Sequence, residues 1–433
     1  MFATEARGRY NSAMRMWWYK LGKAFGPGLI TGASDDDPSA VTTYSQAGAS
    51  FGYTQLWTAF YSLPLLIAVQ EMSARIGLAS GRGIAYLINQ RYSKPIVYGA
   101  VLILCITNIV TIGADLGAMA SAAQLIVPAP FWLLILGMTL LIVILEVAVS
   151  YKQYVRFLKY LTLFFIAYIV TAFLVNADWG LVMINTFIPK ISFNETYWLS
   201  IIAILGATIS PYAMFWQADE EVEEGVAHYA QRSMTEGVPN LTEHHVKHMR
   251  IDTVIGMLFA NLIMFFVILT TGATIGQNGG GLIENASQAA SVLVSFGGSF
   301  TPILFALGII GIGLLAIPIL AGSAAYAVAE VFGWKEGLYL NYNRAKGFYG
   351  VIIVATIIGL CINFSSIQPF RMLYYASALN GVLAVPLLIM MVHIANDKKI
   401  MGTHINSSLS NVVVWLTIAI MCISSVLLVV SYF

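Results

Sequence analysis

The sequence predicts an all-α polytopic membrane protein with eleven transmembrane helices, built as a 5+5 inverted repeat in which helices 1 and 6 are unwound in mid-membrane. Three observations lead to this prediction. Hydrophobic residues make up 58% of the 433 residues and charged residues only 10%, whereas soluble domains carry roughly 25% charged residues. Apolar runs of about 20 residues recur along the whole chain. Two of the predicted spans are interrupted by a proline.

Ten apolar stretches are long enough to cross about 30 Å of hydrocarbon. They leave no room for a separate soluble domain, so we expect one membrane domain over residues 1–433. The stretches lie at residues 55–79, 96–127, 131–150, 158–176, 198–218, 251–276, 300–330, 349–364, 372–394 and 410–432.

An eleventh span, at residues 25–50, is hidden from hydropathy by three acids and a proline. Basic residues cluster before it and again after the next span, and such clusters mark the cytoplasmic side, so two crossings must separate them. Eleven spans place 20 of the 22 Lys and Arg residues inside and only Lys190 and Arg371 outside. We therefore expect a cytoplasmic N-terminus and an external C-terminus. The inside clusters are Arg7–Lys23, Arg75–Lys94, Lys152–Lys159, Arg232–Arg250, Lys335–Lys346 and Lys398–Lys399.

Helix 1 carries the acids Asp35, Asp36 and Asp37 directly before Pro38. Burying carboxylates at this depth costs several kcal/mol, and such residues usually mark an ion path. The proline removes a backbone donor, so the helix should unwind here and free carbonyl groups. Carboxylates beside free carbonyls predict a cation site.

Helix 6 has a matching break where Pro211 follows Ser210. Helices 1 and 6 are five spans apart, so they run in opposite directions, as inverted repeats require. We expect the repeats at about 24–176 and 196–394, with an extra helix at about 409–432. Paired broken helices predict a transporter's midplane site.

These breaks lie in segments that resemble the Nramp superfamily of divalent-metal transporters. GPGLITGASDDDPSA at 26–40 resembles the first-helix block ending in Asp-Pro-Gly-Asn, and QEMSARIGLASG at 70–81 resembles the second-helix block. GATISPYA at 206–213 stands where the family has Gly-Ala-x-x-Met-Pro-His-Asn. The resemblance implies the leucine-transporter fold, a metal bound between the two unwound segments, alternating access, and a transporter without enzymatic activity or a cofactor.

Aligned on the prolines, the resemblance carries the metal-binding aspartate onto Asp37, the carbonyl ligand onto Ala207 and the metal-binding methionine onto Ser210. Ala40 stands for the family's asparagine and Tyr212 for its histidine. The soft thioether is therefore absent, and the remaining oxygen ligands and water suit Mg²⁺ and Mn²⁺. This pattern resembles the Nramp-related magnesium transporters.

Two further residues complete the predicted metal site. Asp36 is expected to hold the ion through water, and Asn380 lies near a helix-10 position where the family often has a polar side chain. Asp35 is expected either to cap the unwound segment or to face the inner vestibule.

The third span contains the positions where proton-coupled family members carry the acids of a Thr-Asp-x-x-Glu pattern. In this chain, those positions align with Asn108 and Thr111. Neither residue titrates, and histidine, the usual relay near neutral pH, is replaced at position 212. We therefore expect uncoupled import of Mg²⁺, and also of Mn²⁺, as partly hydrated ions. Asp115 takes the relay role if the alignment shifts.

Several alternatives remain open. The nearest is a proton-coupled Mn²⁺/Fe²⁺ transporter, and a more distant one is an amino-acid carrier of the same fold, which the acids of helix 1 disfavour. An intramembrane aspartyl protease using Asp37 and Asp115 is disfavoured because the usual Gly-x-Gly-Asp block is missing. The net charge of +1 gives no reason to expect nucleic acid. We expect a monomer in the inner (plasma) membrane of a prokaryote.

Three other polar groups have ordinary structural explanations. The acids of ADEEVEEG at 218–225 are expected to form a solvated helix end, with attraction of cations to the inner mouth as the alternative. Glu71 and Arg75 are spaced to pair with each other. The cluster of His244, His245 and His248 is not favoured as a regulatory metal site, because no carboxylate-rich context surrounds it.

Overall fold

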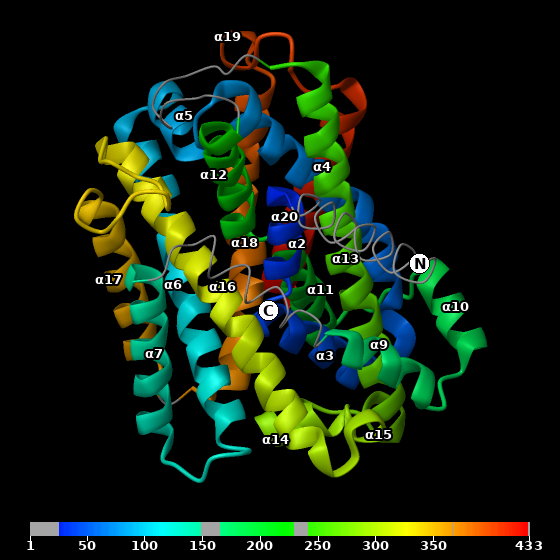
Figure 1. Cartoon of the computed structure of the whole chain (residues 1–433). Helices are drawn as coiled ribbons and strands as arrows, with labels where there is room; N and C mark the ends of the chain where they lie inside the picture. The colour runs from blue at the N-terminus through cyan, green and yellow to red at the C-terminus, as the bar shows by residue number, and fades with distance from the viewer. Residues whose placement is uncertain (1–25, 149–164, 229–240, 366, 432–433) are drawn as a thin grey trace, which may run out of the picture.

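The computed structural model of the chain describes residues 26–148, 165–228, 241–365 and 367–431, and all regular structure within them is helical. The helices form a single elongated bundle (Figure 1). The predicted basic clusters Arg7–Lys23 and Lys152–Lys159, together with Arg232, lie outside the described residues.

The first half of the chain supplies five of the predicted spans. Helix 1 is split into α2 and α3, the second span is α4, and the third to fifth are α6, α7 and α9. The bounds are α2 Pro27–Asp35, α3 Pro38–Phe51, η1 Gly52–Gln55, α4 Leu56–Ser80, α5 Ile84–Arg91, α6 Lys94–Ala123, α7 Phe131–Ala148, α9 Phe165–Leu174 and α10 Trp179–Phe187.

The second half supplies the other six. Helix 6 is split into α11 and α12, and the later spans are α13, α16, α17, α18 and α20. The bounds are α11 Glu195–Thr208, α12 Pro211–His228, α13 Glu243–Thr274, η3 Gly276–Asn278, α14 Ala286–Ser291, α15 Val294–Gly297, η4 Gly298–Phe300, α16 Thr301–Phe332, α17 Lys346–Ile362, α18 Pro369–Ala395, α19 Lys398–Met401 and α20 Ser408–Ser431.

Within the described residues, each predicted span therefore coincides with a helix or a pair of helices. Residues 149–150 of the fourth span and 158–164 of the fifth lie outside the described residues. Among the described residues, seven helices are long and apolar enough to cross a membrane by length and composition alone. The other four predicted spans do not meet these criteria: helix 1 is split into α2 and α3, α4 is less apolar, and α9 and α17 are short in the described part of the chain. In Figure 1, α3 lies below α2 whereas α12 lies above α11, so the two broken helices run in opposite directions, as predicted.

The two halves of helix 1 pack against different parts of α13. Backbone N–H groups of Gly26 and Gly28, at the start of α2, donate to the Asp252 carboxylate at 3.1 and 2.7 Å. A Cβ at Gly28 would meet the Thr253 backbone at 2.5 Å, and one at Gly256 would collide with the Gly28 carbonyl. The backbones of α2 and α13 therefore touch, because only glycine leaves room for such an approach.

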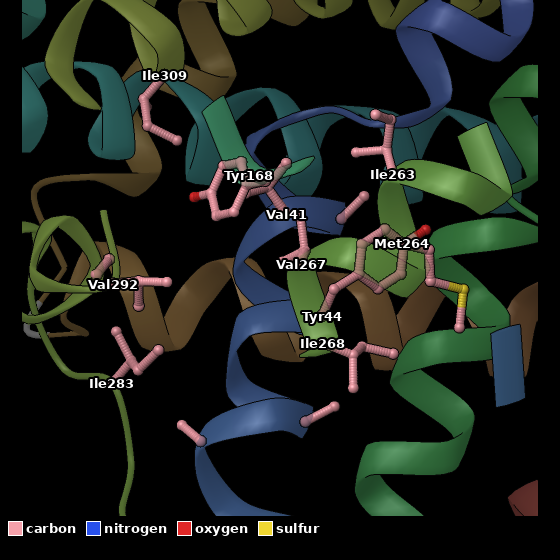
Figure 2. Close-up of a cluster of buried hydrophobic side chains, with 14 of the residues drawn as sticks. Val41, Tyr44, Tyr168, Ile263, Met264, Val267, Ile268, Ile283, Val292 and Ile309 are labelled. Atoms are coloured by element: carbon pink, nitrogen blue, oxygen red, sulfur yellow. The ribbon is translucent and has the colours of Figure 1, made fainter. Parts of the chain in front are cut away.

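The apolar core lies around the second half of helix 1. Figure 2 shows Val41 and Tyr44 of α3 among Ile263, Val267 and other buried side chains of α13, with Tyr168 of α9 nearby. All of these side chains are buried. Burying each large apolar side chain is worth about 1.5 to 3 kcal/mol in water, but within a bilayer close packing is what holds such helices together.

Two sequence-based expectations outside the breaks have clear outcomes. The pairing of Glu71 with Arg75 is confirmed at 3.0 Å, and Arg250 joins the same carboxylate at 2.7 Å. The solvated helix end at 218–225 is wrong. Asp219 is only 1% exposed and Glu220 7% exposed, because α12 continues past them and packs between α4 and α16.

The histidine cluster begins α13. His245 caps the helix by accepting from the backbone of Thr242, and its ring lies 6.3 Å from that of His244. Within the described residues, no group of three or more His, Cys, Asp or Glu side chains converges to hold a metal, so the three histidines do not form such a group.

Candidate metal-binding site

Helix 1 is interrupted at the predicted acids. The backbone leaves the helical conformation at Asp36, with φ −82° and ψ 55°, and is extended at Asp37, with φ −68° and ψ 173°. Helix α3 then begins at Pro38, where the missing N–H is harmless because the first N–H groups of a helix have no partner within it. The sequence positions the break because Pro38 cannot donate to the carbonyl of Ser34 four residues earlier.

Asp37 is the N-cap of α3. Its Oδ1 accepts from the backbone N–H of Ala40 at 2.7 Å and from the hydroxyl of Ser39 at 2.6 Å. Its Oδ2 faces the Tyr212 hydroxyl at 3.3 Å, and the side chain is 2% exposed. One oxygen is therefore fixed by the helix, and the other faces the break of helix 6.

Helix 6 is interrupted in the same way. Helix α11 ends at Thr208, Ile209 has φ −117° and ψ 61°, and α12 begins at Pro211. Because Pro211 has no N–H, the carbonyl of Ala207 loses the donor that a continuous helix would supply. Ala207 is buried at 4% exposure, and its carbonyl oxygen stays a predicted ligand.

Tyr212 connects the two breaks. Its hydroxyl lies 3.2 Å from the carbonyl of Ser34 and 3.3 Å from Asp37 Oδ2. A phenol has one proton to donate, so it serves one of these acceptors at a time. Ser34 is the residue whose carbonyl Pro38 leaves without a helical donor, so Tyr212 replaces that donor from the other broken helix.

Ser210 lies at the break but engages a different acid from the one predicted to hold the metal. Its hydroxyl donates to Asp35 Oδ1 at 3.0 Å. Asp35 thus contacts the break of helix 6, where it is 1% exposed, a contact that neither expectation for Asp35 included.

Asp36 has no hydrogen-bond partner for either carboxylate oxygen, although it is fully buried. The charged groups that act most strongly on it are its neighbours Asp35 and Asp37. Leaving a buried carboxylate unpaired costs several kcal/mol unless a proton or a cation compensates it. Asp36 is therefore the residue of the break that most needs a cation.

Asp115 belongs to the same group. It lies on α6, is fully buried, and neither of its oxygens has a hydrogen-bond partner. Asp37 and the backbone of Ser39 are the groups that act on it. No ion pair among the described residues involves any of the four acids. The sequence signal for Asp115 was a lone acid in an apolar span, but only packing shows that it faces helix 1.

Asn380 contacts α6 instead of the acids of helix 1. Its amide donates to the Thr111 hydroxyl at 3.3 Å. Ser377, one turn earlier on α18, makes the contact with α3, since it bonds the Thr43 hydroxyl at 2.9 Å and the Ser39 carbonyl at 3.4 Å. Ser377 was not predicted from the sequence, although its spacing of three residues from Asn380 places both on one helix face.

The two family coupling positions carry neutral, bonded side chains. Asn108 donates to the carbonyl of Leu320 on α16 at 2.9 Å, and Thr111 accepts from Asn380. Neither can exchange a proton near neutral pH.

The arrangement suits a hard cation that keeps part of its water shell. It offers buried carboxylates, a carbonyl without a helical donor and hydroxyls, which are the ligands preferred by Mg²⁺ and Mn²⁺. Position 210 carries no thioether, and the Met119 sulfur packs against Gly313 of α16. Because no three acidic side chains converge on one point in the described part of the chain, water and the backbone would have to complete the shell.

Comparison with known proteins gives a family match over most of the chain. The family model described as natural resistance-associated macrophage protein-like (Nramp) matches residues 28–431. The divalent metal cation transporter MntH of Bacillus subtilis is 25% identical over 413 residues, which is 94% of this chain and 92% of that protein. The MntH of Agrobacterium fabrum is 27% identical over 303 residues, which is 67% of this chain but only 62% of that protein.

Solved structures share the fold. The manganese transporter of Eremococcus coleocola matches with a TM-score of 0.70 and 17% identity, covering 96% of this chain and 87% of that chain. MhsT, solved in complex with L-phenylalanine, matches with a TM-score of 0.59 and 12% identity, covering 94% of this chain and 98% of that chain. At these identities the likeness is one of fold.

Proposed function

Because the chain belongs to the natural resistance-associated macrophage protein-like family of membrane transporters, we propose that it carries divalent metal cations through the site between the breaks of helices 1 and 6. The observation that carries the proposal is the fully buried Asp36, whose carboxylate has no partner, beside the capped Asp37. The names of the Bacillus and Agrobacterium relatives support the same substrate class.

We propose Mg²⁺ as the main substrate and Mn²⁺ as a second one. The support is chemical: Ser210 replaces a thioether ligand, and Ala40 is a small residue where an amide would occupy the space of a water molecule. Mg²⁺ retains several waters and binds directly through only one or two carboxylates. We therefore propose that the chain is similar in substrate to the Nramp-related magnesium transporters.

We also propose uniport without proton coupling, by alternating access. Asn108 and Thr111 carry no titratable proton and both are engaged in hydrogen bonds. The rival function is proton-coupled transport of Mn²⁺ or Fe²⁺, which Asp115 favours because it is a buried acid on the same helix. We further propose a monomer in the plasma membrane. The distribution of Lys and Arg supports placing its N-terminus in the cytoplasm.

The test is uptake of Mg²⁺ and Mn²⁺ into proteoliposomes that contain an internal pH dye. We expect uptake of both ions without acidification, and a loss of at least tenfold with Asp37→Ala. Asp178→Asn is the matched control: it removes an exposed acid that caps α10, and asparagine is an equally good cap.

Each of the other outcomes decides the proposal. Mn²⁺ uptake with acidification and no Mg²⁺ uptake would establish the proton-coupled rival. Acidification that Asp115→Asn abolishes would assign the proton to that residue. Uptake that Asp37→Ala leaves intact would refute the site.

A further inference from the structure

A second group of buried acids lies away from the breaks, where α5 begins. Asp219 comes from α12, Glu330 from the last turn of α16, and Glu336 from the segment that follows. A Cβ at Gly83 would collide with both Glu330 Oε1 and Asp219 Oδ1. The two carboxylate oxygens therefore lie against the same small space, although their residues are far apart in the chain. In Figure 1, α5 and α12 lie near one end of the bundle.

All three carboxylates are buried, and two of them are incompletely bonded, whereas Glu330 also receives backbone hydrogen bonds from Gly83 and Ala85 at the start of α5. Glu330 is 5% exposed, and its Oε2 accepts from the backbone N–H of Tyr86 at 3.0 Å, in the first turn of α5. Asp219 is 1% exposed, yet its Oδ1 has no partner. Glu336 is 9% exposed, and its Oε2 also has none. Two unpartnered, buried carboxylate oxygens thus belong to this group.

The charges around this group do not balance. Glu330 and Glu336 act most strongly on Asp219, and Glu220 and Glu223 add to them. Burial, and then the charge of Glu330, raise the pKa of Glu336 to about 9, against the opposing effect of Arg82.

Glu223 already has hydrogen-bond donors, and Arg82 acts on more than one of these acids. Glu223 accepts from the Tyr326 hydroxyl and from the backbone N–H of Leu338. Arg82 also acts on Glu330 and lies over the ring of Tyr86 at 4.6 Å. One guanidinium cannot neutralise Asp219, Glu330 and Glu336 together, so a proton or a cation must compensate the remainder.

We infer that Asp219 and Glu330, with Glu336 beside them, form a second divalent-cation site that binds Mg²⁺ or Mn²⁺ through two carboxylates and retained water. Mg²⁺ rarely takes a cage made only of protein groups and commonly uses one or two carboxylates. The site is therefore compatible with the absence, among the described residues, of three converging acidic or histidine side chains. The inference goes beyond the transport proposal and rests on it only for the identity of the cation.

The position of the site suggests what a bound cation would do. Asp219 follows Pro211 by eight residues on α12, which is about 12 Å along the helix. A cation between Asp219 and Glu330 would join α12, the second half of helix 6, to α16 and to the start of α5. The charge distribution assigns this end of the bundle to the cytoplasm, so the ion that binds here is an internal one.

The experiment measures Mn²⁺ binding to the purified full-length chain by electron paramagnetic resonance, in which bound Mn²⁺ disappears from the free-ion signal. The Asp37→Ala variant is the background, because it weakens the site at the breaks. We expect this variant to retain about one bound Mn²⁺ per chain, displaced by added Mg²⁺. Adding either Asp219→Asn or Glu330→Gln should weaken that binding at least tenfold.

The matched control adds Glu243→Gln, which removes an exposed acid from the first turn of α13 and should leave the binding unchanged. Asn and Gln keep the size of the original side chains, and circular dichroism confirms the fold of each variant. A third variant, Gly83→Ala, places a methyl group between the two oxygens and should weaken binding without removing a charge.

Two results would overturn the inference. If Asp37→Ala binds no Mn²⁺ at millimolar concentration, the carboxylates share a proton instead. If the remaining binding is insensitive to Asp219→Asn and Glu330→Gln, it belongs to the acids of helix 1. Neither result bears on transport, which is decided by uptake into proteoliposomes of the unmodified chain.

Discussion

Replacing Asp36 by asparagine should stabilise the protein without metal and weaken its response to metal. In the absence of a cation, Asp36 is a buried carboxylate without a partner between two other acids. Removing its charge while keeping its size relieves that repulsion, which should raise the free energy of unfolding by at least about 1 kcal/mol.

The response to Mg²⁺ should change in the opposite direction. A ligand at 100 times its Kd stabilises the folded state by about 2.7 kcal/mol. If the Asp36 charge contributes about 1.4 kcal/mol to binding, Asp36→Asn weakens the site tenfold, and the same Mg²⁺ concentration then gives only about 1.4 kcal/mol. The loss is larger if Asp36 is a direct ligand.

The assay is thermal unfolding in detergent, with and without Mg²⁺, of the unmodified chain, Asp36→Asn and the control Asp178→Asn. We expect a higher Tm for Asp36→Asn without metal and about half the Mg²⁺-induced shift. A lower Tm without metal, or an unchanged shift, would show that a proton and not a cation normally compensates Asp36, and the reasoning from its missing partners would fail.

Three further predictions concern other parts of the chain. Burial and Glu330 raise the pKa of Glu336 from 4.5 to about 9, so between these values the folded state binds more protons than the unfolded state. Without divalent cations, the free energy of unfolding should therefore fall as the pH rises through this window. Unfolding measured as a function of pH should show this slope, and Glu336→Gln should flatten it. Glu71→Gln leaves the buried guanidinium of Arg75 with a neutral partner and should cost about 3 kcal/mol in chemical unfolding, whereas Glu284→Gln breaks an exposed pair and should cost under about 1 kcal/mol. Ser210→Met adds a soft thioether and should raise the Mn²⁺ to Mg²⁺ uptake ratio in competition assays, while an unchanged ratio would place Ser210 outside the ion's shell.

The breaks could be predicted because they depend on local covalent chemistry. Every proline lacks an N–H, but Pro64, Pro318 and Pro386 lie inside continuous helices. The signal for the breaks was therefore a proline directly after polar residues: the acids before Pro38, and Ser210 before Pro211. The eleven spans could be predicted because their apolar runs and basic flanks are also properties of the sequence.

The contacts that could not be predicted from the sequence depend on packing between distant segments. Asp219 and Glu220 look solvated in sequence because they are acidic and lie at the end of an apolar run, but α4 and α16 cover them. Likewise, Ser377 and Asn380 share a face of α18, and which of them contacts α3 depends on where along that face α3 packs, which no local pattern specifies.

The contact between α2 and α13 has a consequence for how the chain is made. The N–H groups that open the first span are satisfied by Asp252, a residue synthesised more than 220 positions later. The same span is the one whose acids and proline make it poorly apolar, so it has little tendency to remain in the bilayer alone. Helix 1, which is synthesised before the other predicted spans, can therefore be among the last of them to settle, held by the translocation machinery or by neighbouring helices until the seventh span arrives.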